Sequence, residues 1–233
     1  MARINLVGRR SLAVGMGAVL ATVLLVLSLP RTLAALVTIP SALVLERLQH
    51  QQPVTFADLE TVAAAQARGL IFVNDGRLST DLGLAHLLMA ERLPADEPRV
   101  GNDLALAVQA LTDGLVVAPG NPYAWARLSY AEARKRGWSP LALSALRLAL
   151  LTASYEPRLL WSRLRLSLLA WPHMPPEDRE IVYQQIRIGW EENRVEMAQL
   201  ANDLDRVNVV RAALLRDSEA AAAFEKMVRP PAR

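Results

Sequence analysis

Residues 125–128 read WARL and residues 161–164 read WSRL, so Trp, Arg and Leu recur after 36 positions. Both tetrapeptides lie in leucine- and alanine-rich segments with the spacing of amphipathic helices. A recurrence at an interval of 20 to 50 positions is typical of a structural unit that a chain uses more than once. The motif therefore favours a repeat array, because the alternative, a generic helical bundle, has no reason to repeat it.

The composition of the 233-residue chain favours helices. Hydrophobic residues make up 52 % of the sequence but aromatic residues only 5 %, so the core must consist mainly of Leu, Ala and Val. No segment shows the strict alternation of a strand, and we predict an all-α fold. The absence of cysteine excludes disulfides, thiolate zinc sites and cysteine nucleophiles.

Residues 11–29, SLAVGMGAVLATVLLVLSL, contain no charge and are long enough as a helix to cross most of a bilayer core. Three arginines lie within residues 1–10, whereas only Arg31 follows closely. The positive-inside rule then places residues 1–10 in the cytoplasm. We expect a signal anchor in the inner membrane of a bacterium, with the C-terminal domain in the periplasm.

A cleaved signal peptide is the alternative, because Pro30 is followed by small residues at Ala34 and Ala35. The uncleaved anchor is favoured because the apolar run exceeds the usual length of a signal-peptide core and continues through residues 33–45. A buried helix of a soluble domain is the third interpretation.

Turn-forming residues divide the rest of the chain into helices. Thr55 with Asp58 is close to a capping box, and APGNP at residues 118–122 is a strong break. We predict a stalk and linker at residues 30–54, helical repeats at 55–176 and a helical cap at 177–233. The expected helices are residues 56–69, 81–93, 103–117, 123–136, 140–152, 158–170, 177–200 and 204–227.

Two of these helices carry small residues seven positions apart with a leucine between them, where a second helix could cross closely. The two sets are Ala107, Leu111 and Gly114, followed by Pro119, and Ala142, Leu146 and Ala149.

Together with the tryptophan motif, these sets resemble the tetratricopeptide repeat, with a first helix W-x2-L-G-x2-Y and a second helix A-x3-F-x2-A followed by proline. The resemblance covers about residues 103–170. It departs from the pattern at the glycine position, Ser129 and Arg165, and at the tyrosine position, Glu132 and Leu168. It implies a solenoid of helical hairpins that acts as an adaptor, which residues 177–233 would cap.

No catalytic or metal-binding pattern stands out. His50, His86 and His173 lie far apart, and there is no GxSxG, Walker or GxGxxG motif. Acidic pairs fall at expected helix starts, where the helix dipole favours them. We therefore expect no enzyme activity, no cofactor and no metal.

The charge is unevenly distributed. Residues 1–50 carry a net +4 and the rest of the chain a net −1, which argues against nucleic-acid binding. Within the rest, residues 51–120 carry −5, residues 121–170 carry +6 and residues 171–233 carry −2. The basic segment 121–170 contains both tryptophan motifs.

In a solenoid the first helices line the concave face, so Arg127 and Arg163 would lie one above the other. The expected partner-binding residues are Arg127, Arg163, Tyr123, Tyr130, Arg134 and Arg165. Guanidinium groups bind carboxylates and phosphates. The structural alternative is that Arg127 and Arg163 pair with acids of adjacent repeats. Trp125 and Trp161 are expected to pack inside their hairpins.

We therefore expect a non-catalytic scaffold, tethered to the membrane, that binds another cell-envelope protein in surface polysaccharide or envelope assembly. A direct binder of an anionic glycan or lipid headgroup through residues 121–170 is the alternative. An enzyme whose acid and base are hidden in the solenoid is the third hypothesis.

Overall fold

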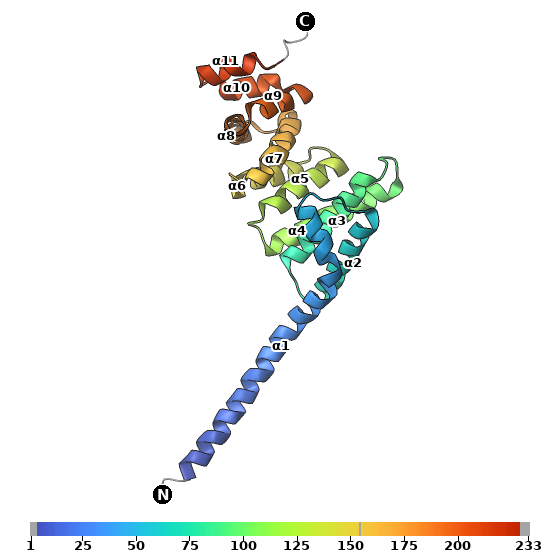
Figure 1. Cartoon of the computed structure of the whole chain (residues 1–233), viewed down its shortest axis with the longest axis vertical. Helices are drawn as coiled ribbons and strands as arrows, with labels where there is room; N and C mark the ends of the chain where they lie inside the picture. The colour runs from blue at the N-terminus through green and yellow to red at the C-terminus, as the bar shows by residue number, and fades with distance from the viewer. Residues whose placement is uncertain (1–3, 154, 229–233) are drawn as a thin grey trace.

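The computed structural model describes residues 4–153 and 155–228, and this part of the chain is helical without strands, which confirms the all-α prediction (Figure 1). The helices are α1 (Ile4–Gln49), α2 (Phe56–Phe72), α3 (Gly76–Arg92), α4 (Pro98–Val117), α5 (Pro122–Arg136), α6 (Pro140–Thr152), α7 (Pro157–Ala170), the short 3-10 helix η1 (Trp171–His173), α8 (Pro176–Glu192), α9 (Arg194–Asp203), α10 (Val207–Leu214) and α11 (Ser218–Glu225).

Helix α1 is 46 residues long and continues through Pro30 and Pro40. The segment expected as a stalk and linker is therefore helical as far as Gln49. The N-terminal half of α1 projects alone from the helical body (Figure 1). Within its section Gly15–Gln49, a stretch of 18 residues reaches a mean hydropathy of 2.0, so α1 is long and apolar enough to cross a membrane.

Helix α2 packs against the second half of α1. The expected capping box is present, because Thr55 Oγ1 accepts from Asp58 N (3.1 Å) and Asp58 Oδ2 accepts from Thr55 N (2.8 Å). We expected the helix to end at Gly69, but it continues to Phe72. At Gly69, α2 instead approaches α1 closely, since a methyl group there would lie 2.9 Å from Thr38 Cγ2 of α1.

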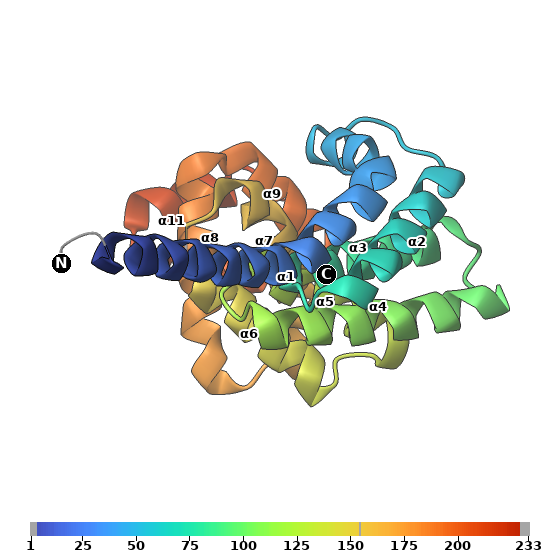
Figure 2. The same cartoon turned by 90° about the horizontal axis from the view of Figure 1, so that it is seen from below.

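Two other helices begin earlier in the sequence than expected. Helix α3 begins at Gly76 rather than near residue 81, because Asp75 caps it by accepting from the backbone N–H groups of Arg77 (2.8 Å) and Leu78 (3.1 Å). Helix α4 begins at Pro98, since proline fits the first turn of a helix. Helix α3 packs against both α2 and α4 (Figure 2).

Helices α3 and α4 cross at small residues. A methyl group at Gly114 would lie 2.6 Å from Thr80 Cγ2 and 2.8 Å from the carbonyl oxygen of Gly76, and one at Gly83 would lie 3.1 Å from the carbonyl oxygen of Ala107. The predicted close approach at Ala107 and Gly114 is therefore present, with α3 as the partner helix.

Helix α6 packs against α5, and the residues of its predicted crossing set, Ala142, Leu146 and Ala149, are fully buried. Helix α5 also contacts α3 and α7. The first helices of three successive hairpins, α3, α5 and α7, are thus neighbours.

The two long C-terminal helices that we expected are four shorter ones. Asn193 is extended between α8 and α9 and caps α9 through Glu196 N (3.1 Å), and Asp217 caps α11. The short helices surround a shared core in which the rings of Trp190 and Phe224 meet edge to face, with 5.8 Å between centroids.

Candidate functional site

An open groove of about 810 Å³ lies where four segments of the chain converge. The last residues of α1 and the connection after it, 48–51, form one side. The first two turns of α3 and α5 and the first turn of α7 form the other. Its charged and aromatic lining residues are His50, Arg77, Asp81, Tyr123, Arg127 and Arg158.

Arg127 is the most enclosed of the three arginines in this groove, and its guanidinium carbon lies 5.9 Å from the ring centre of Tyr123. Among the described residues it has no hydrogen-bonded or ion-paired partner. Burial lowers the pKa of Arg127, and the negative charge of Asp81 opposes this effect. The site therefore holds a guanidinium whose lost hydration is only partly compensated.

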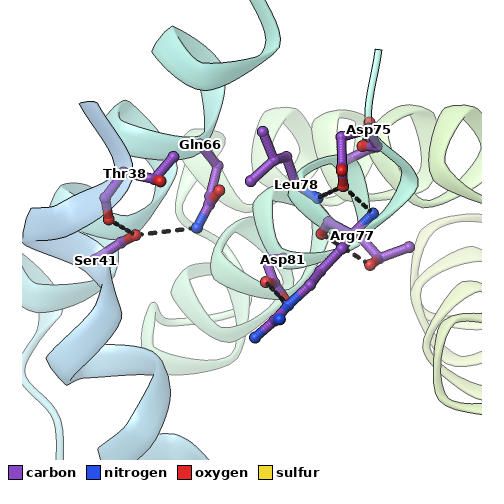
Figure 3. Close-up of polar contacts among 9 residues, drawn as sticks. Thr38, Ser41, Gln66, Asp75, Arg77, Leu78 and Asp81 are labelled. Atoms are coloured by element: carbon purple, nitrogen blue, oxygen red, sulfur yellow. Dashed lines mark hydrogen bonds and ion pairs between the residues drawn. The ribbon is translucent and has the colours of Figure 1, made fainter. Parts of the chain in front are cut away.

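Asp81 faces the same space, and it is the one acidic side chain in the described lining of the groove. Burial raises its pKa, while the charges of Arg77 and Arg127 oppose the increase. Figure 3 shows Arg77 extending toward Asp81, with 3.7 Å between Arg77 Nε and Asp81 Oδ2. A second anion would meet an excess of positive charge here.

The groove continues between α1 and α3 into a smaller hollow of about 380 Å³, which also borders Gln49, Arg77 and Asp81. Its wall carries Gln66 of α2, whose Nε2 donates to Ser41 Oγ of α1 at 3.0 Å (Figure 3). This buried contact fixes α1 against α2. It positions the end of α1 that closes one side of the arginine groove.

The arrangement suits a carboxylate or phosphate group. The starts of α3, α5 and α7 border the groove, and N-terminal helix ends carry partial positive charge. The arginines add charge that can form forked hydrogen bonds. An acidic side chain or chain terminus that enters the groove would compensate Arg127.

The structure brings together only two of the six predicted partner-binding residues, Tyr123 and Arg127. Tyr130 and Arg134 form their own pair on α5, with Arg134 Nη1 donating to Tyr130 Oη at 3.2 Å. Arg165 borders a different hollow, of about 390 Å³, between α7 and α9.

The expectation for Arg163 is wrong, because this side chain is fully buried rather than stacked with Arg127 in an exposed row. Its Nη1 donates to the carbonyl oxygens of Ala149 (3.0 Å) and Ala153 at the end of α6. Burial lowers the pKa of Arg163. Its contacts are those of a structural cap for α6.

The other basic residues of segment 121–170 do not form one face. Arg136 lies 3.9 Å from Glu132, and Arg147 lies 3.3 Å from Asp178 of α8. Arg158 instead reaches the groove, and sequence reasoning did not select it. One sequence signal was available, since Arg158 and Tyr123 both follow the proline that begins their helix.

The remaining candidates have structural contacts. His86 Nδ1 lies 2.9 Å from Asp103 Oδ1 and so connects α3 to α4. Both motif tryptophans are partly buried against the core, and Trp125 Nε1 also donates to the carbonyl oxygen of Pro119 at 2.7 Å. Residues 4–153 and 155–228 contain no group of three potential metal ligands.

Comparisons of the chain with family models, curated proteins and solved structures give no significant match.

Proposed function

We propose that this chain is a non-catalytic adaptor anchored in the membrane by α1, and that the arginine groove binds an acidic segment of another cell-envelope protein. The N-terminus lies in the cytoplasm and the helical body in the periplasm in this proposal. The arginine excess before the apolar part of α1 supports that orientation.

The observation that carries the binding site is Arg127. A partly buried guanidinium without an ion-paired partner in the described chain is costly, and an incoming carboxylate would offset that cost. The ring of Tyr123 beside it offers an apolar surface to the stem of an acidic side chain. Arg77 and Arg158 can extend recognition to neighbouring acidic groups.

The arrangement of α3, α5 and α7 supports a tetratricopeptide-like array for the middle of the chain. These helices are neighbours; α4 crosses α3 closely at Gly114, and α6 packs against α5 with Ala142, Leu146 and Ala149 buried. Such arrays generally use their first helices to bind peptides, and here their first turns form the groove.

A protein partner fits these contacts better than a long anionic glycan that follows residues 121–170. Such a polymer would need a continuous basic face, but Arg163 is buried and Arg147 lies beside an acid. The groove instead concentrates charge at one place, which matches a short acidic segment. Direct binding of a glycan or lipid headgroup is the other outcome that the experiment distinguishes.

The experiment places a photocrosslinker at Tyr123 of the full-length chain in native membranes. We expect a protease-sensitive adduct that Arg127→Gln reduces about tenfold, because a charge-assisted hydrogen bond contributes about 1.5–3 kcal/mol. Arg134→Gln is the matched control on the same helix, since Arg134 is exposed and outside the groove lining. Asp81→Asn should increase the adduct.

Equal effects of Arg127→Gln and Arg134→Gln would refute the groove. A protease-resistant adduct that disappears steeply with rising salt would show a glycan or lipid instead.

A further inference from the structure

Four large apolar side chains are exposed at the ends of α2 and α4. Ile71 is 77 % exposed, Phe72 38 %, Val116 80 % and Val117 43 %. They come from segments more than 40 residues apart, so their proximity is a property of the fold rather than of one apolar run. We call these four residues the membrane-proximal rim.

The end of α2 lies beside the top of the apolar half of α1. A methyl group at Gly69 would lie 3.9 Å from the carbonyl oxygen of Ala34. Just beyond, residues 73–75 share a hollow of about 800 Å³ with Leu27 and Arg31. Figure 1 shows the α2–α3 connection at the end of the body from which α1 leaves.

The end of α4 lies at the same connection. A methyl group at Gly76, the first residue of α3, would lie 3.2 Å from Val117 Cβ and 3.0 Å from Ala118 Cβ. Both α2 and α4 therefore end near the start of α3. Their exposed apolar residues lie close to the level at which α1 leaves its uncharged section.

The bilayer is the occupant that this position favours. Ala34 follows Leu29, the last residue of the uncharged section, by about 7.5 Å along the helix. The polar layer on each side of the hydrocarbon core is about 5–7 Å thick. Residues 73–75, which follow α2, border Leu27 and Arg31 on either side of Leu29. Exposed apolar groups at this end of the body therefore lie within that layer, where such residues partition favourably. Arg31 and the exposed Arg68 are nearby cations for anionic headgroups.

We infer that the membrane-proximal rim inserts into the interfacial layer of the bilayer that α1 crosses. This inference rests on the proposed anchoring by α1 and goes beyond it, because it adds two contacts away from the α1 axis. Helix α1 and the ends of α2 and α4 would then contact the membrane plane at three places, which fixes the orientation of the helical body. The arginine groove then keeps a constant direction relative to the membrane.

The chain contains no cysteine, so single cysteines can be labelled with the environment-sensitive fluorophore NBD. The full-length variants are Ile71→Cys, Val116→Cys, Leu24→Cys in the apolar half of α1, and Leu215→Cys. Leu215 is 68 % exposed and lies just after α10, so it is a control of matched exposure. Each labelled chain is reconstituted into vesicles of phosphatidylcholine and phosphatidylglycerol that contain shallow or deep doxyl-labelled lipid.

We expect deep quencher to act most strongly on Leu24→Cys and shallow quencher on Ile71→Cys and Val116→Cys. Leu215→Cys should show the emission of a label in water and no quenching. If Leu24→Cys is quenched but both rim positions behave like Leu215→Cys, the rim inference fails and the anchor stands. If Leu24→Cys is not quenched either, the anchor and the rim inference fail together.

Discussion

Gly114 tests the crossing of α3 and α4, because a methyl group there meets backbone atoms. It would lie 2.6 Å from Thr80 Cγ2, 2.8 Å from the carbonyl oxygen of Gly76 and 3.1 Å from the backbone nitrogen of Thr80. Gly101, on the same helix, has open space around the equivalent position. Gly114→Ala and Gly101→Ala are therefore the same chemical change with and without a steric conflict.

Both substitutions gain about 0.5–1 kcal/mol because alanine favours the helix. For Gly114→Ala, the helices must also separate by about 0.8 Å to bring the 2.6 Å contact to the 3.4 Å limit of ordinary contacts. Overpacking typically costs about 1–3 kcal/mol, and the upper end applies because the opposing backbone cannot rotate away. The net result is about 2 kcal/mol of destabilisation for Gly114→Ala and about 0.5 kcal/mol of stabilisation for Gly101→Ala.

Thermal unfolding of the full-length variants in detergent, followed by circular dichroism at 222 nm, measures this difference. At about 2–4 °C per kcal/mol for a chain of this size, Gly114→Ala should unfold about 4–8 °C below the wild-type chain. Gly101→Ala should unfold about 1–2 °C above it. A Gly114→Ala midpoint at or above that of the wild type would refute the close approach, and equal losses in both variants would refute the steric explanation.

Two other predictions concern capping. Arg163→Met leaves the carbonyl oxygens of Ala149 and Ala153 without their donor, although it also removes a buried charge. It should therefore lower the free energy of unfolding by about 1–3 kcal/mol in urea titrations. Arg165→Met, at an exposed position, should change it by less than about 0.5 kcal/mol. The backbone N–H and hydroxyl of Thr55 hold the pKa of Asp58 below its ordinary value of 3.8. Ionised Asp58 therefore stabilises the fold above that pH and loses its contribution as pH falls through the lower pKa. The stability difference between the wild type and Asp58→Asn should shrink below about pH 4 in thermal melts.

The helical class and the α3–α4 crossing could be predicted because their causes are local in sequence. The spacing of Ala107, Leu111 and Gly114 marks a helix face that admits a close neighbour, and the structure places Gly114 at such a contact. The early start of α3 was missed because the capping role of Asp75, which accepts from two backbone N–H groups of this helix, was not predicted.

The arginine groove could be predicted only in part, because it is assembled from four distant segments. The repeat motif identified Arg127, and Tyr123 was expected as its neighbour. The sequence did not indicate that the end of α1 covers them or that Arg77 and Asp81 face them. Nothing local to residues 48–51 indicates this contact. It follows from the packing of α1 on α2.

Arg127 and Arg163 make different contacts because the helices that precede them, α4 and α6, end differently. When the set Ala107, Leu111 and Gly114 is aligned with the set Ala142, Leu146 and Ala149, Gly114 of α4 corresponds to Ala149 of α6. The carbonyl of Gly114 accepts from the backbone N–H of Ala118 at 2.9 Å, so α4 closes its last turn with its own backbone. The carbonyl of Ala149 accepts from Arg163 instead. The arginine of the motif therefore caps a helix in one hairpin, as Arg163, and remains available to a ligand in the other, as Arg127.

In the proposed function, the continuity of α1 determines where a partner must present its acidic segment. Helix α1 runs without a break from the uncharged section to Gln49, and Gln49 borders the groove. The 20 residues from Leu29 to Gln49 correspond to about 30 Å of helix. A partner from the same membrane would need at least about nine extended residues to span that distance, or a folded domain of similar height. The proposed anchor would therefore select partners by the height of their acidic segment above the bilayer as well as by its charge.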